Sequence, residues 1–330
     1  MVDSVRLGEW VVNTSDKAGN VENSPAIEAF LARYLASAMP LYTADYPVQN
    51  LSMARFGIPA PVIRMDMPPA TEGFRGVYEV EANPSGLGIA DMINLPMAGQ
   101  IAGFLRAQGI SEIGYAAAPS RLDQMADHDV FMKALGRNGV ASRLINLESE
   151  RPRDMPLWLR AGQEDIKLLL SGENPLMSDC LLCHYDGGGH KGYLIDIGDA
   201  VSVETITDFS EEPFDRYPDG FVLKPKHGWG TRDTHVYVPR TPFKKSGVTR
   251  AKMVRLLNDV RELRADEKYI LQPFGAPEVS EDGAFRIWRL YALWDGTAYR
   301  VVGGFWAQRK SSLRIHGADD CVMGPLVVKH

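Results

Sequence analysis

The sequence predicts an α/β fold with additional α+β elements, arranged in two domains. Its 330 residues, 45% apolar and 24% charged, have an ordinary globular composition, which excludes disorder, a disulfide scaffold or a coiled coil for the whole chain. Segments with apolar residues at helical spacing alternate with segments at strand spacing, and such alternation favours helices packed on a parallel sheet. A domain has roughly 150 residues, and the segment 148–156 is charged and contains prolines. We therefore expect domains at 1–150 and 151–330.

The first domain is expected to alternate helices and strands. Ser24 and Pro25 are a helix-start signal, and apolar residues at helical spacing follow until Met39 meets Pro40, where the helix is expected to end. Two strands then flank the turn-forming segment PPATEG. The expected elements are helix 25–39, strands 62–67 and 77–82, helix 92–108, strand 112–119, helix 127–138 and strand 141–147.

The second domain is expected to begin with apolar segments and to continue with strands around a glycine-containing loop. The strand FVLKP contains Lys224 near its end, the loop HGWGTRD follows, and a second strand comes after the loop. The last part of the chain predicts a hairpin that turns at Asp295 and Gly296. The expected elements are strands 221–225 and 234–239, helix 253–263, strand 269–274 and hairpin 285–308.

The loop after the strand FVLKP is a candidate phosphate site. Lys224 stands at the strand end, and Gly228 and Gly230 let backbone N–H groups approach an anion. The alternative is that Lys224 is a solvated strand end and that the glycines only form a hairpin. The spacing fits neither a P-loop nor a G-x-G-x-x-G turn, so a different nucleotide fold is needed.

A second candidate site is acidic and lies on the strands 62–67 and 77–82. Side chains at i and i+2 of a strand share a face, so Glu81 and Asn83 lie together, as do Arg64 and Asp66. If the two strands are neighbours, three oxygen ligands converge, and such oxygens suit Mg²⁺. The alternative is that Glu81 and Asp66 form surface ion pairs with Arg64 or Arg75.

These segments together resemble the circularly permuted ATP-grasp ligases. The likeness is to the synthetase domain of glutathionylspermidine synthase and, more distantly, to eukaryotic glutathione synthetase. It is carried by RMDMPPATEGFRGVYEVEANPSG, FVLKPKHGWGTRDTHV, YILQPF and GGFWAQRKSSLRIHG, whose order and spacing agree with the family. The resemblance implies an ATP-grasp fold preceded by a pre-ATP-grasp-like α/β lobe.

The resemblance also implies a role for each candidate residue. It implies ATP and Mg²⁺ as cofactors, with Asp66, Glu81 and Asn83 as the metal ligands and Arg64 against the reacting carboxylate. The residues that it assigns to the nucleotide are Lys191, Lys224 and Arg314 for phosphates, Gly228 and Gly230 in the lid, and the backbone of Gln272, Pro273 and Phe274 for adenine.

The implied activity is formation of an amide or peptide bond by a carboxylate–amine ligase. ATP would convert a carboxylate to an acylphosphate, an amine would displace phosphate, and ADP would be released. The partners are then a small-molecule carboxylate and an amine of the amino acid, peptide or polyamine class. Two alternatives stay open: an inactive ATP-grasp nucleotide-binding regulatory protein, and another ATP-dependent phosphotransferase.

Charge and hydropathy argue against nucleic acid and membranes as partners. The net charge of −6 gives no positive field for nucleic acid. No apolar run reaches the roughly 20 residues of a membrane helix, and no signal peptide is visible, so a cytoplasmic location is expected. Cys180, Cys183 and His184 have the C-x-x-C-H form of a haem site. Buried thiols are preferred over haem or over zinc held with His190.

Overall fold

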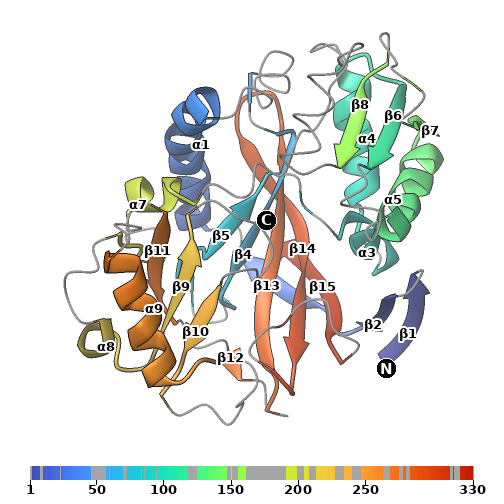
Figure 1. The fold of residues 1–330 in the computed structure, drawn as a ribbon. Coiled ribbons are helices and arrows are strands. Elements are labelled where there is room, and N and C mark those ends of the chain that lie inside the picture. The colour runs from blue at the N-terminus through green and yellow to red at the C-terminus, as the bar shows by residue number, and fades with distance from the viewer. Residues whose placement is uncertain are drawn as a thin grey trace.

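The computed structural model combines three β-sheets with helices packed against them in the part of the chain that it describes (Figure 1). The mixed α/β class predicted from the sequence is confirmed. The described residues are 2–7, 10–22, 24–45, 57–58, 60–69, 73–82, 84, 86–93, 95–117, 125–146, 150, 155–160, 191–198, 204–207, 213–226, 234–239, 247–262, 268–274, 278–279, 283–312, 315 and 320–329.

The largest sheet has nine strands and takes them from both ends of the chain. Its order is β1-β2-β15-β14-β13-β4-β5, with β12 beside β13 and β3 beside β15. Neighbours are antiparallel except where β15 meets β2 and β3. The strands are β1 Val2–Leu7, β2 Trp10–Ser15, β3 Gly19–Glu22, β4 Val62–Met67, β5 Glu79–Glu81, β12 Glu278–Val279, β13 Phe285–Trp294, β14 Tyr299–Arg309 and β15 Val322–Lys329.

Each face of this sheet packs against a different set of helices. One face holds Met65, Trp288 and Leu290 against α1 (Pro25–Asp45) and α7 (Tyr193–Ile197). The other face holds Val62 and Leu293 against two further helices and a second sheet. Those helices are α3 (Leu87–Met92) and α4 (Met97–Ala107). Because alternate residues of a strand point to opposite faces, one strand supplies both cores.

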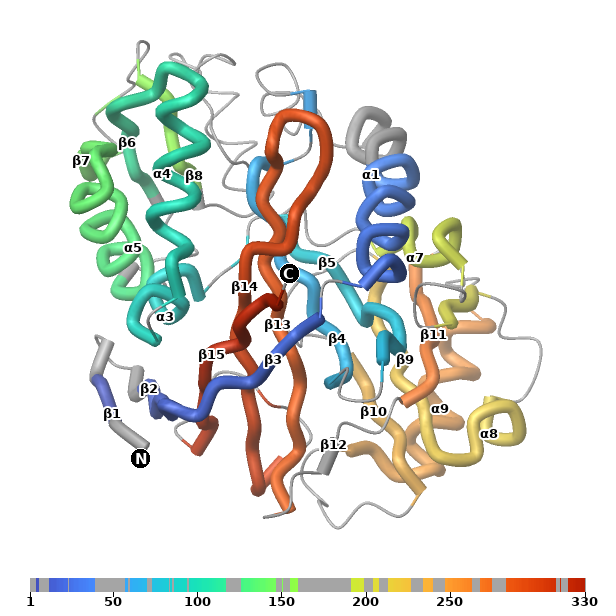
Figure 2. The backbone as a smooth tube through the Cα atoms, turned by 180° about the vertical axis from the view of Figure 1, so that it is seen from behind, coloured from blue at the N-terminus to red at the C-terminus, as the bar shows by residue number. Residues whose placement is uncertain are grey.

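A parallel sheet of order β7-β6-β8 lies on one side of the long strands of the large sheet (Figure 2). The strand–helix–strand pattern predicted this parallel pairing. A helix between two strands carries the chain back to the end of the sheet where the first strand began, so both strands run in the same direction. The core around it includes the fully buried side chains of Phe131 and Trp158. The elements are β6 Glu112–Ala117, α5 Met125–Arg137, β7 Ala141–Leu144 and β8 Leu157–Arg160.

The third sheet, of order β10-β9-β11, lies on the other side in both views (Figures 1 and 2). Its strands are antiparallel. Phe221 and Leu223 pack against Met253 and Leu257 in a small core of their own. The elements are α8 Pro213–Arg216, β9 Phe221–Pro225, β10 His235–Tyr237, α9 Arg250–Glu262 and β11 Tyr269–Pro273.

Two predicted helix boundaries are wrong, and both involve proline. The helix expected to end at Pro40 continues to Asp45, although an interior proline removes one hydrogen bond and its ring clashes with the preceding turn. The helix expected over 92–108 is instead α3 followed by α4. Pro96 stands just before α4, and proline disfavours helical backbone in the residue that precedes it.

Other differences concern strands and domains. Strands β1, β2, β3 and β15 were not expected from the sequence. The nine-stranded sheet joins strands from 1–150 to strands from 151–330, and the division into two domains at 150 stays a prediction. Cys180, Cys183, His184 and His190 lie outside the described residues. Among the described helices, none is long and apolar enough to cross a membrane.

Candidate functional site

Strand β5 is an edge of the nine-stranded sheet. Side chains from α7 and from the β10-β9-β11 sheet, called the small sheet below, form hydrogen bonds with its backbone and with that of the preceding residue. The Tyr193 hydroxyl accepts a hydrogen bond of 2.6 Å from the Val80 N–H. Lys224 Nζ and Gln272 Nε2 donate to the Tyr78 carbonyl at 3.2 and 3.3 Å. These three side chains come from α7, β9 and β11, so residues far apart in the sequence meet at one strand.

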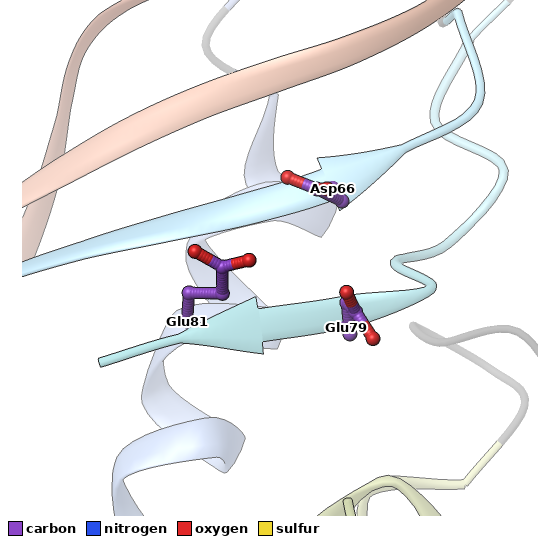
Figure 3. Close-up of side chains that lie close together, drawn as sticks. All are labelled: Asp66, Glu79 and Glu81. Carbon is purple, nitrogen blue, oxygen red and sulfur yellow. The ribbon is translucent and has the colours of Figure 1, made fainter. Parts of the chain in front are cut away.

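The three carboxylates of the site lie on β4 and β5, on the same face of the sheet (Figure 3). Asp66 is the cross-strand neighbour of Glu79, and Arg64 is the neighbour of Glu81. Cross-strand neighbours point to the same face. One carboxylate oxygen from each of Asp66, Glu79 and Glu81 lies within 4.8 Å of the other two.

Arg64 joins two of these carboxylates. Its Nε lies 2.8 Å from Asp66 Oδ1 and its terminal nitrogen 2.7 Å from Glu81 Oε1, while only 2% of its side chain is exposed. Burial by itself would lower the pKa of Arg64, but the two carboxylates outweigh burial and raise that pKa well above its usual value. The ion pairs that the sequence left as an alternative are therefore present, and they are buried.

Glu79 faces the lysines of the second half of the chain. Lys191 Nζ and Lys224 Nζ each lie 3.8 Å from Glu79 Oε2, which is longer than a hydrogen bond. Burial raises the pKa of Glu79, but the two ammonium groups outweigh it, and the net pKa is lowered. Burial lowers the pKa of Lys224 from 10.5 to about 8, although Glu79 opposes that change.

The backbone explains why the two lysines meet. Lys224 is in β9, and the Lys191 N–H donates to the Lys226 carbonyl, just beyond the end of that strand, at 2.8 Å. Lys191 then precedes α7 and accepts from the Leu194 N–H at 3.1 Å. Lys191 therefore lies just before the first turn of α7.

A fourth cation completes the cluster. Arg289 of β13 is the cross-strand neighbour of Asp66, and its Nε lies 3.4 Å from Asp66 Oδ2. The cluster therefore holds four cationic side chains against three carboxylates: Arg64, Lys191, Lys224 and Arg289 against Asp66, Glu79 and Glu81.

The donor set fits magnesium only in the company of an anion. Carboxylate oxygens are the ligands that Mg²⁺ prefers, and three of them converge here. Among these seven described side chains the cations outnumber the carboxylates, so a bare divalent ion would enter a positive cluster, whereas Mg²⁺ on a nucleotide phosphate would bring negative charge with it. The residues present therefore fit a magnesium–polyphosphate complex.

The structure brings together six residues that the sequence predicted: Arg64, Asp66, Glu81, Lys191, Lys224 and Gln272. Gln272 Nε2 also donates to Thr205 Oγ1 at 2.8 Å. Phe274 follows Pro273 at the end of β11, and its N–H donates to the Gly220 carbonyl at 2.8 Å. Adenine recognition by this segment stays a prediction. Asn83, Gly228, Gly230 and Arg314 lie outside the described residues.

Three residues of the site were missed by the sequence reasoning. Glu79 stands two positions from Glu81, so the alternation that grouped Glu81 with Asn83 could also have found it. Arg289 is a charged residue inside an apolar strand, and that contrast was the available signal. Tyr193 gave no signal, because its bond to β5 depends on the fold.

Comparisons with known proteins find no family match and only distant structural similarity. A scan against protein-family models finds no match, and a search of curated proteins finds none. Among solved structures, the chain is similar to one from Methylobacillus flagellatus described as a "putative gamma-glutamylcysteine synthetase", with 12% sequence identity and a TM-score of 0.37. The match covers 92% of this chain and 87% of that one. At that TM-score the likeness does not establish a shared fold.

Proposed function

We propose that this chain is an ATP-dependent ligase that joins a carboxylate to an amine and releases ADP and phosphate. The observation that carries the proposal is the position of Glu79, which lies within 3.8 Å of Lys191 and of Lys224 and beside two further carboxylates. The ATP-grasp resemblance requires this meeting of acids from one half of the chain with lysines from the other.

The roles follow from charge and position. Asp66, Glu79 and Glu81 would hold Mg²⁺, which on binding neutralises charge on the phosphates and on the group in transfer. Lys191 and Lys224 would bind phosphate oxygens as mobile point charges. Both ammonium groups lie beyond hydrogen-bond distance of Glu79, so each can turn to an oxyanion without losing a direct hydrogen bond to Glu79.

The chemical step balances with ATP and two organic substrates. The bond between the γ-phosphorus and the ADP oxygen breaks as a carboxylate oxygen bonds to phosphorus. The amine then attacks the acyl carbon, phosphate leaves, and the amine loses a proton. Burial of the cluster limits water, which would otherwise hydrolyse the acylphosphate.

Arg64 acts in this proposal by positioning. It bonds to both Asp66 and Glu81 and is almost fully buried, so it keeps two carboxylates at one place before any ligand binds. A fixed arrangement of charges lowers the reorganisation that binding and reaction require. Contact of Arg64 with a substrate carboxylate, as the resemblance implies, stays a prediction.

Hydroxylamine trapping tests the proposal without knowledge of the natural amine. The chain is incubated with Mg-ATP, hydroxylamine and single amino acids, short peptides or dicarboxylates, and both ADP and hydroxamate are measured. We expect at least one acid to give equal amounts of the two products. We expect Glu81→Gln to abolish the reaction while Glu112→Gln, a matched change at an exposed position of β6, leaves it intact.

The other results each count against a ligase. ADP without hydroxamate would indicate a different ATP-dependent phosphotransfer. Binding of Mg-ATP with no ADP release for any acid would indicate a nucleotide-binding regulatory protein. Full activity of Glu81→Gln would refute the assignment of the metal ligands.

A further inference from the structure

Arg289 is a buried charge in the middle of the nine-stranded sheet. It lies on β13 between Trp288, which is 4% exposed, and the fully buried residues Leu290 and Tyr291. Only 10% of the Arg289 side chain is exposed. It shares the sheet face of Asp66, its cross-strand neighbour. A buried arginine is rarely found without a strong partner, so its contacts need an explanation.

The contacts of Arg289 leave its Nε without a hydrogen bond. That atom is buried and has no hydrogen-bond partner, and its approach to Asp66 Oδ2 at 3.4 Å is an ion pair only. The guanidinium carbon lies 5.7 Å from the centre of the Phe305 ring, which contributes a cation–π contact. A buried donor left in this way is costly, and an oxyanion ligand would satisfy it.

Arg289 lies across the carboxylates from the lysines. One row of cross-strand neighbours runs Glu79, Asp66, Arg289 over β5, β4 and β13. Lys191 and Lys224 stand at the Glu79 end. Strands are about 4.8 Å apart, so two strand spacings, roughly 10 Å, separate the backbone of Glu79 from that of Arg289. A phosphoryl group transferred in line needs its donor on one side and its acceptor on the other.

The second arginine of the cluster is differently placed. Arg64 has hydrogen bonds to Asp66 and an ion pair of 2.7 Å with Glu81. Its guanidinium is therefore committed to the carboxylates that would hold the metal. Among the carboxylates that the structure describes, Arg289 has an ion pair with Asp66 alone, and at the longer distance of 3.4 Å, so a ligand competes for Arg289 against a weaker contact.

We infer that Arg289 binds the carboxylate of the acid substrate that accepts the phosphoryl group, while Arg64 positions the metal-binding carboxylates. The inference rests on the proposed function. It differs from the family resemblance, which places Arg64 at the reacting carboxylate. An arginine can hold a carboxylate through two parallel hydrogen bonds, which would orient the oxygen that bonds to phosphorus.

The test measures kinetics with an acid that supports ADP release in the hydroxylamine assay. In Arg289→Met we expect kcat/KM for that acid to fall on the order of 10²–10³-fold, with the KM for ATP changed less than about twofold. Arg289→Lys keeps the charge without the planar donor pair, so we expect a smaller loss. In Arg289→Ala, added methylguanidinium should restore part of the activity, which a residue needed only for stability would not do.

Arg286→Met is the matched control, because Arg286 is on the same strand but bonds to Gln308 and lies over Trp306. It should keep the native kinetics. If Arg289→Met does not fold, Arg289→Lys carries the test.

Three results would overturn the inference. The first is native acid kinetics in the folded Met variant or, failing that, in the Lys variant. The second is an Arg289 variant that binds Mg-AMPPNP more weakly, binds Mg-ADP normally and keeps native kinetics for the acid. That result would place Arg289 at the γ-phosphate. The third is the absence of ADP release by the native chain with every acid. That third result refutes the proposed function as well, whereas the first two refute only the role of Arg289.

Discussion

The clearest quantitative prediction concerns Lys224, whose charge is held in a buried place. Replacing Lys224 with Met removes that charge and keeps most of the side-chain volume. The pKa of Lys224 lies at about 8 instead of 10.5 because of burial, and at about 1.36 kcal/mol per pKa unit this difference corresponds to about 3 kcal/mol of folding free energy. The native chain therefore carries a cost at neutral pH that the variant lacks.

The sign follows from where the proton binds. Between pH 8 and 10.5 the unfolded chain keeps the Lys224 proton and the folded chain releases it, so the free energy of unfolding of the native chain rises with pH in this window. The native value minus the Met value should rise by about 3 kcal/mol in all, with roughly three quarters of the rise between pH 6.5 and pH 10. Urea unfolding of both proteins at a series of pH values measures this difference.

Subtracting the variant cancels the titration of groups that do not interact with Lys224. Lys226→Met, two residues further along the chain, serves as the control for loss of one positive charge near the same strand. A difference between native and Lys224→Met that stays constant from pH 6.5 to pH 10 would show that Lys224 is not charged at a cost, and the reasoning from burial would be refuted.

Four further predictions concern the site and the elements around it. Tyr193→Phe should lower the free energy of unfolding by about 1–3 kcal/mol, because it leaves a buried amide of β5 without its acceptor; a change below about 0.3 kcal/mol in urea unfolding would contradict this. Gly304→Ala should cost about 1–3 kcal/mol or more, since its Cβ would lie 2.1 Å from the Arg289 carbonyl. Gly103→Ala has open space in α4, and thermal unfolding should show it equal to or more stable than the native chain. Glu81→Gln should lower ADP release on the order of 10²-fold or more, and a native rate would remove Glu81 from the site.

Local patterns predicted much of what surrounds the carboxylates. The strands that carry Asp66 and Glu81 are separated by a short turn, so strand alternation and proximity were enough to place both on one face. The strand that contains Lys224 was predictable for the same reason. Each of these inferences needed only residues close together in the sequence.

The contacts that unite the site were out of reach of local reasoning. Lys191 stands 112 positions after Glu79, and Arg289 stands 223 positions after Asp66. Only the pairing of β13 with β4 and the packing of α7 on β5 bring them together. The N-terminal strands were missed for a related reason, because β2 and β3 pair with β15 at the opposite end of the chain.

The side chains that cover β5 affect how readily the protein aggregates. A strand at the end of a sheet is a template on which other chains can stack and aggregate, and here that strand is covered by Tyr193, Lys224 and Gln272. Substitutions that destabilise the small sheet would therefore first raise turbidity and lower the yield of protein in solution. The molecules that stay in solution would still be folded. Ligands that tighten the small sheet would act as solubilisers.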